Sequence, residues 1–194
     1  VGRSVADQVG QALVRQQIDV VVQSRYAATP VASSLPRTVV DQIASLPQVR
    51  GIDGLTIDRR RVDGDATVFL LGASRFAEFA GRLGMAIVRG RAHRPGSTEL
   101  VIGERTARAL ALGVGDRLDL GAGPWEIVGV YSTWLDFLNA GVVADLAAAQ
   151  RLAERPDRVN ILFLSLTDPA AASQVSEQIV RSFPGLWATT TVNS

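Results

Sequence analysis

The chain has 194 residues and a formal net charge of +1, and 47% of its residues are hydrophobic. This composition allows a sizeable buried core and gives no electrostatic case for binding nucleic acid or an anionic membrane surface. The chain has no cysteine, and all twenty of its basic residues are arginine. Disulfides, thiol catalysis, cysteine zinc sites, Schiff bases and lysine-dependent phosphate loops are therefore excluded.

Up to residue 73 the chain predicts helix, strand, helix, strand and strand. Residues 1–17 carry one narrow apolar stripe at helical spacing, which suits a stalk helix packed on a neighbour. Ile18–Ser24 is rich in β-branched residues and predicts a buried strand. Leu35–Leu46 predicts a helix with proline in its first turn and another proline after its end. Further strands are expected over Val49–Val62 and Ala66–Leu71.

The segment from about 85 to 150 has a different texture, because short apolar runs alternate with glycine turns. One helix is expected over Glu104–Leu112. Four short strands are expected over Met85–Arg89, Thr98–Ile102, Arg117–Leu120 and Trp125–Tyr131. This pattern predicts a compact β-rich subdomain, with Trp125 in its core.

The C-terminal end repeats the order of elements seen at the start. Val159–Thr167 predicts a strand that is apolar on both faces, and Asp168-Pro169 is an N-cap pair that begins a helix. Leu186–Val192 predicts the last strand, with Trp187 in the core. The expected fold is α+β, with a split β-α-β subdomain over 18–73 plus 158–194 and a smaller β-rich subdomain inserted over 74–157.

A family resemblance appears in the middle segment. From Glu99 the chain reads ELVIGERTARALALGVGDRLDLGAGPWEIVGVYST, which resembles the periplasmic core domain of MacB-type and other FtsX-like permeases. That family has a strand ending at a glycine, a short helix, then L-x-V-G-D-x-L-x-L and a strand ending in V-G-V. The matching residues here are Gly103, Leu112–Leu120 and Ile127–Val130, with weaker matches at Leu46–Val49, Gly90-Arg91, Ala147–Leu152 and Val159-Asn160.

The turn within this motif also has a purely structural explanation. Gly113 and Gly115 bracket it, and Asp116 can accept hydrogen bonds from its backbone amides. No part of the motif requires a ligand.

The resemblance implies a non-catalytic, extracytoplasmic domain of an ABC transporter permease in the cell membrane. Residues 1–17 would continue the first membrane helix, and the split β-α-β subdomain would be porter-like. The domain would transmit ATP-driven movement to an extracytoplasmic protein, lipoprotein or substrate. The other implied partners are a cytoplasmic ATPase subunit, which binds the ATP and is reached through the membrane part, and a second permease copy. No cofactor, metal or nucleic acid is expected in the domain itself.

Two observations agree with an excised or processed piece of a longer protein. The chain starts at Val1 without methionine, and no apolar run approaches the ~20 residues that a membrane helix needs.

Ionisable residues give few candidates for chemistry. His93 is the sole histidine, which excludes a histidine triad or a multi-histidine metal site, and it is interpreted as a surface loop residue or a pH-sensitive contact. Asp63-Gly64-Asp65 is a hairpin turn or a weak cation site, and Asp53 and Asp58 lie before it. In the run Arg59–Arg61, alternation puts the two outer arginines on one face, as a solvated surface or as a patch for an acidic partner or lipid.

The candidate partner-binding site is the connection Thr133–Asn139, which follows a strand and contains Trp134, Leu135, Phe137 and Leu138. Four large apolar side chains are too many for a solvated loop. Either they fold back and cap the β-rich subdomain, or they form an exposed patch that docks a partner or touches the bilayer.

Two rival functions are weighed against the permease domain. A small-molecule-sensing ectodomain of a membrane signalling protein would bind its ligand between the subdomains. A hydrolase would need a nucleophile and base, and no serine stands in a Gly-x-Ser-x-Gly context.

Overall fold

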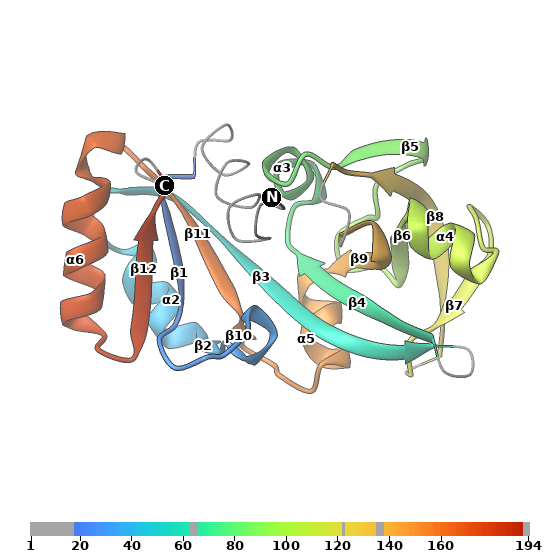
Figure 1. Cartoon of the computed structure of the whole chain (residues 1–194), viewed down its shortest axis with the longest axis horizontal. Helices are drawn as coiled ribbons and strands as arrows, with labels where there is room; N and C mark the ends of the chain where they lie inside the picture. Colours follow the sequence, from blue (N-terminus) through green and yellow to red (C-terminus); the bar gives the residue numbers. More distant parts are fainter. Residues whose placement is uncertain (1–17, 63–65, 122, 135–137, 192–194) are drawn as a thin grey trace, which may run out of the picture. The chain divides into compact units, whose positions relative to one another are not determined.

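The computed structural model describes residues 18–62, 66–121, 123–134 and 138–191 (Figure 1). The stalk helix expected over 1–17 and the turn expected at Asp63-Gly64-Asp65 lie outside these residues. The chain forms two compact units, one from the residues up to Leu55 and from Asp157 onward, and the other from Thr56 to Pro156. No helix within the described ranges is long and apolar enough to cross a membrane.

The first unit is an antiparallel sheet in the order β12-β1-β11-β3, with the chain running β-α-β-β-α-β through it (Figure 1). This order, 4-1-3-2 in chain sequence, is that of two split β-α-β units that share one sheet. Its elements are β1 (Val20–Ser24), η1 (Pro30–Ala32), β2 (Leu35–Pro36), α2 (Arg37–Ala44), β3 (Val49–Val62, whose residues to Leu55 belong here), β10 (Arg158–Val159), β11 (Ile161–Leu166), η3 (Pro169–Ala171), α6 (Ala172–Ser182) and β12 (Leu186–Thr190).

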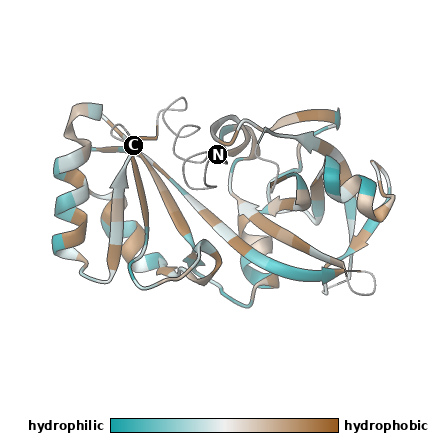
Figure 2. Ribbon diagram, viewed as in Figure 1, coloured by the Kyte–Doolittle hydropathy of each residue, from teal (hydrophilic) through white to brown (hydrophobic). Residues whose placement is uncertain are grey.

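The core of the first unit comes from the apolar positions that the sequence pattern singles out. Val20 and Val22 of β1 are fully buried, and so are Val175 and Ile179 of α6. Each such side chain contributes roughly 1.5–3 kcal/mol by leaving water. Hydrophilic and hydrophobic positions alternate along α6 (Figure 2), and its polar residues Gln174, Glu177 and Arg181 are exposed. Ser176 on α6 also donates a hydrogen bond of 2.7 Å from its hydroxyl to the carbonyl of Ala188 in β12.

The first helix of this unit starts two residues later than its apolar pattern suggests. Leu35 and Pro36 form β2, which pairs with Arg158 and Val159 of β10 in a small second sheet. Pro36 is therefore the N-cap of α2 instead of a first-turn residue. A helix of eight residues is too short to be stable alone, so α2 depends on burying its apolar side, where Ile43 is fully buried.

The second unit is a mixed sheet in the order β3-β4-β9-β6-β8-β5, with β7 paired to β8. Strands β4 and β9 run parallel, as do β6 and β8, while β9 runs antiparallel to β6. The elements are β4 (Ala66–Ala73), α3 (Phe76–Arg82), β5 (Ala86–Gly90), β6 (Glu99–Gly103), α4 (Glu104–Leu110), β7 (Arg117–Asp119), β8 (Pro124–Ser132), η2 (Leu138–Ala140), β9 (Gly141–Asp145) and α5 (Leu146–Leu152).

A continuous apolar cluster fills the second unit between its sheet and its helices. Leu70, Ile102 and Ile127 are fully buried members from three strands, and Ala148 and Ala149 join them from α5. The turn of the family-like motif contributes as its sequence suggests, because Asp116 accepts a 2.8 Å hydrogen bond from the amide of Gly113. Gly115 has a φ of +96°, a conformation that glycine adopts without strain.

Residues 56–73 belong with the second unit in the structure, whereas the sequence pattern predicts them in the first. The reason is strand pairing: β4 lies beside β9 from Phe69 opposite Gly141 to Ala73 opposite Asp145. A parallel pair between strands so far apart in the chain leaves no local signal in the sequence.

The expected α+β class is confirmed, and nearly every expected strand appears within a few residues of its expected bounds. The sequence pattern does not predict α3, β9 and α5, nor the short strand β2 that pairs with β10.

Candidate functional site

The connection between β8 and β9 is closed by a pair of hydrogen bonds at its base. The amide of Thr133 donates to Oδ1 of Asn139 at 3.0 Å, and Nδ2 of Asn139 donates back to the carbonyl of Thr133 at 2.7 Å. One asparagine thus satisfies both backbone groups of Thr133 and fixes where the connection starts and ends.

The C-terminal end of the connection is held in the interior. The Tyr131 hydroxyl donates to the carbonyl of Leu138 at 2.5 Å, and both side chains are buried. Burial raises the pKa of Tyr131 well above its usual range, so its hydroxyl remains a donor. Gly103 allows the close approach of this end, because a Cβ there would lie 2.3 Å from the carbonyl oxygen of Asn139.

The N-terminal end of the connection rests on the end of α3. The Thr133 hydroxyl donates to the carbonyl of Leu83 at 2.9 Å. Trp134 lies with one indole edge on Gly84, where a Cβ would be only 2.4 Å from Nε1. Gly84 has a φ of +59°, so the glycine serves both the backbone turn and the close contact. The rest of the indole faces solvent, since Trp134 is 53% exposed.

The four side chains proposed for partner binding therefore do not share one environment. Leu138 is 6% exposed and belongs to the core, as the capping alternative requires. Trp134 is the exposed residue that remains available to a partner, and Leu135 and Phe137 lie outside the residues that the structure describes. The docking hypothesis stays a prediction and is now centred on Trp134.

His93 is buried, which corrects the expectation of a surface residue. It is 6% exposed, and its ring meets Phe76 of α3 edge to face with centroids 5.7 Å apart. Desolvation lowers the pKa of His93 below its usual value of 6.5, despite opposing effects of the Arg94 carbonyl and of the acidic residues Asp145 and Glu99. Loop position alone could not reveal this burial, because Phe76 is distant in sequence.

The segment around His93 is anchored on one carboxylate. Oε1 of Glu99 accepts hydrogen bonds from Arg91 at 2.7 Å and from Arg94 at 2.6 Å, and Oε2 accepts from the Arg94 amide at 2.8 Å. The hydrogen bond from the Arg91 side chain has the largest effect on the pKa of Glu99, and together with those from Arg94 it holds this pKa far below its usual value. The Gly90-Arg91 step of the family pattern therefore has a structural use here.

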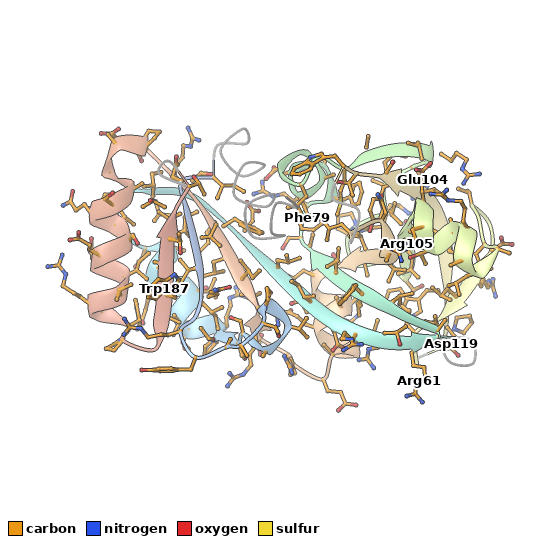
Figure 3. All side chains as sticks on the ribbon, viewed as in Figure 1. Arg61, Phe79, Glu104, Arg105, Asp119 and Trp187 are labelled. Carbon is orange, nitrogen blue, oxygen red and sulfur yellow. The ribbon has the colours of Figure 1, made fainter. Side chains whose placement is uncertain are left out.

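The charged run on β3 alternates as expected. Arg59 and Arg61 are exposed, and Arg61 projects away from the strand in Figure 3. Between them, Arg60 pairs with Asp58 at 2.9 Å on the other face. Within the described part of the chain, no three His, Cys, Asp or Glu residues are placed to hold a metal ion. Asp53 and Asp58 are therefore not part of a described cation site.

Trp187 corrects a second expectation, since it is 49% exposed instead of core. The Arg25 guanidinium lies 5.8 Å from its ring centroid, a cation–π contact. A shallow groove of about 390 Å³ lies beside it between α6 and β12. The sequence did hold a signal: in Leu186–Thr190 the alternation puts Trp187 on the same side as Thr189, which is the polar side of the strand. Trp125, by contrast, is core as expected.

Asn160, the last residue of the family pattern, acts as a structural anchor. Its Nδ2 donates to the carbonyls of Val31 at 2.8 Å and Ser33 at 2.9 Å, and Asn160 is almost completely buried. It ties the loop after β1 to the strand pair at the other end of the chain.

Comparison with known families identifies this arrangement. The family of MacB-like periplasmic core domains matches residues 1–182 of the chain. The chain belongs to this family. MacB-like periplasmic core domains are parts of ABC transporter permeases, and their placement is extracytoplasmic.

Solved structures show the same fold as this MacB-like domain. The periplasmic region of MacB from Actinobacillus actinomycetemcomitans aligns with a TM-score of 0.70 and 10% identity, covering 97% of this chain and 94% of that chain. The extracellular domain of the noncanonic ABC-type transporter YknZ from Gram-positive bacteria aligns with a TM-score of 0.64 and 10% identity, covering 89% and 98%. A search of curated protein sequences finds no match.

Proposed function

We propose that this domain transmits the ATP-driven movement of a permease's membrane part to an extracytoplasmic partner or substrate. The domain performs no catalysis and holds no cofactor of its own. ATP is bound and hydrolysed by a separate cytoplasmic subunit, and the permease sits in the cell membrane. Membership of the MacB-like family supports the transporter context, and the observations below support the mechanical role.

The observation that carries this proposal is the way the two ends of the first unit are joined. The amide of Thr191 donates to the carbonyl of Asp19 at 3.1 Å, and the Thr191 hydroxyl donates to the carbonyl of Ile18. The Asp19 carboxylate in turn accepts the amide of Leu166 at 2.6 Å. Movement that enters before residue 18 is therefore shared at once by three adjacent strands, β1, β12 and β11.

Trp134 is the proposed point of contact with the partner. It combines a large apolar surface with a base fixed by Asn139 and Gly84, so little conformational entropy would be lost on docking. Aromatic side chains with these properties are frequent anchors of protein interfaces.

The mechanical role can be tested in the full-length permease reconstituted with its ATPase. The 194 residues of the domain contain no cysteine, and Val114 is 51% exposed. With any cysteine elsewhere in the permease and its ATPase replaced by serine, Val114→Cys gives one spin-label site in each of the two permease copies. The distance distribution between the labels, measured by pulsed electron paramagnetic resonance, is expected to change between nucleotide-free and ATP-bound states. With an ATPase subunit that binds but cannot hydrolyse ATP, the labels should keep the distance distribution of the ATP-bound state. An unchanged distribution during active hydrolysis would reject mechanical transmission.

A further inference from the structure

His93 is a buried titratable group without a partner for one of its two nitrogens. Its Nδ1 lies 3.5 Å from the carbonyl of Arg94, at the long limit of a hydrogen bond. Its Nε2 is buried, and nothing in the described residues donates to it or accepts from it. A neutral imidazole tolerates this environment, whereas an imidazolium would bury an N–H that has no acceptor.

The residues on either side of His93 cannot move away with it. Arg91 and Arg94 both bind Glu99, and the Arg94 amide binds the same carboxylate. Glu99 stays ionised through the pH range in which histidine titrates, because its pKa lies far below its usual value. Protonation of His93 therefore acts on what the ring touches and leaves the anchor of its own segment intact.

The ring of His93 touches Phe76, the first residue of α3. This helix has seven residues, too few to persist without tertiary support. Its other end carries the contacts of the candidate docking site, namely Leu83 with Thr133 and Gly84 with Trp134. One short helix thus links the unpartnered histidine to the exposed tryptophan.

We propose that neutral His93 is an acid-sensitive support for α3, and that its protonation loosens this helix and shifts Trp134. The ionisable groups that face the ring are Glu99 from β6 and Asp145 from the end of β9, with Arg91 and Arg94 on its own segment. At the start of α3, its N-cap residue Arg75 pairs with Glu78 at 2.8 Å in an exposed position. Glu99 and Asp145 favour the charged imidazole of His93, whereas burial favours the neutral one.

The sign of the pH effect follows from which opposing influence is larger. Desolvation outweighs the acidic groups, so the packed state binds its proton less readily than an open state with the usual value of 6.5. The contribution of His93 to the stability of α3 is therefore complete above pH 6.5 and is lost as the pH falls below 6.5. This inference does not depend on the proposed transport role, since it concerns only residues of the second unit.

The test uses the 194-residue chain and two nuclear magnetic resonance measurements. Because His93 is the sole histidine, its imidazole signals titrate without overlap. Amide hydrogen exchange, expressed as protection factors, is compared at about pH 7.5 and about pH 5.5, on either side of the range in which histidine titrates. Protection of the Phe79 and Leu83 amides in α3 is expected to fall several-fold at the lower pH. The Arg94 amide, bound to Glu99, should keep its protection.

Two further readouts complete the test. The indole signal of Trp134, assigned with Trp134→Phe, should move with the same midpoint as the imidazole of His93. The variant His93→Phe keeps an apolar ring against Phe76 but cannot be protonated, so protection of α3 should become independent of pH. If that variant does not fold, the coincidence of the wild-type midpoints decides instead.

Several results would overturn the proposal. A His93 that titrates at or above 6.5 is not in the packed environment described. Unchanged protection of α3 while His93 titrates would show that the ring does not support the helix. Parallel loss in α3, in the Arg94 amide and in the core strands would mean that the whole unit unfolds.

Discussion

Glu99 is a carboxylate inside the second unit that two arginines share. Its side chain is only 5% exposed, while those of Arg91 and Arg94 are 50% and 74% exposed. Solvent screens the outer ends of both pairs, so the hydrogen bonds to Glu99 carry most of their stabilisation. The consequence is a segment between β5 and β6 that is fixed near its end, beside the buried His93.

Replacing Glu99 by glutamine is expected to lower the free energy of unfolding by about 1.5 kcal/mol near neutral pH, since an amide cannot accept so many charged donors. The folded-state pKa is lowered, so the contribution of Glu99 is present above its usual value of 4.5 and is lost as the pH falls below it. The difference between wild type and Glu99→Gln should therefore shrink below about pH 4.5. Urea unfolding across this range measures it.

Glu126 gives a matched control for that experiment. It lies opposite Glu99 on the neighbouring strand β8 but is exposed. Glu126→Gln should change stability by less than about 0.5 kcal/mol at every pH. Equal effects of the two substitutions would contradict the role assigned to Glu99.

At the scale of elements, the connection between β8 and β9 has a buried side chain at one end and an exposed side chain at the other. Leu138 is in the core and Trp134 rests on Gly84 with half its surface in solvent. The two residues are four positions apart in one connection, yet they have opposite roles.

Serine substitutions should separate these roles. Leu138→Ser removes a buried side chain and is expected to lower the free energy of unfolding by about 2–5 kcal/mol. Trp134→Ser should lower it by about 1 kcal/mol and leave the circular dichroism spectrum unchanged. Thermal and urea unfolding of the isolated chain give both values. If Trp134→Ser is as destabilising as Leu138→Ser, Trp134 is a core residue and the docking hypothesis fails.

The elements that could be predicted from the sequence are those whose pattern is local. β-branched and alternating runs located β1, β3 and β11, and the paired prolines located α2 to within two residues. β9 and α5 were missed because Gly141–Asp145 is short and its partner β4 is distant in the chain. Their order in the sheet is decided by long-range pairing, which no window of sequence contains.

The candidate site was only partly predictable for a related reason. Composition identified the apolar connection after β8, but it could not say that Gly84 would receive Trp134 or that Leu138 would turn inward. His93 was misjudged because Phe76, which buries it, belongs to an element that periodicity did not reveal. Exposure is a property of three-dimensional neighbours, and sequence patterns report it only where an element is regular.

At the scale of the whole molecule, the sequence enters and leaves the described fold through neighbouring strands. Val22 of β1 lies directly opposite Ala188 of β12. Nearly the entire chain lies between these two positions, in both compact units. A single covalent link here would therefore constrain almost the whole unfolded chain.

The double variant Val22→Cys and Ala188→Cys is expected to form one disulfide, because the chain has no other cysteine and these opposite residues form a pair without mutual backbone hydrogen bonds, in which the side chains lie closest. Oxidation should raise the free energy of unfolding by up to about 4 kcal/mol relative to the reduced form. Urea unfolding with and without reductant makes the comparison, with Val22→Cys alone as control. Failure of the pair to oxidise in the folded chain would contradict the register of β1 and β12.

The hydrogen bond from Ser176 to Ala188 bears on self-association. Among the described strands β12 is an edge strand of the sheet, and its free edge faces away from β1. Gly185 and Thr191 turn their backbone groups inward to Arg25 and Asp19, so by alternation the carbonyl of Ala188 points outward. An unpaired carbonyl on an edge strand is a point at which a strand from another molecule can pair. The hydroxyl of Ser176 already donates to the carbonyl of Ala188, so α6 also hinders polymerisation of the protein into fibres through the free edge of β12.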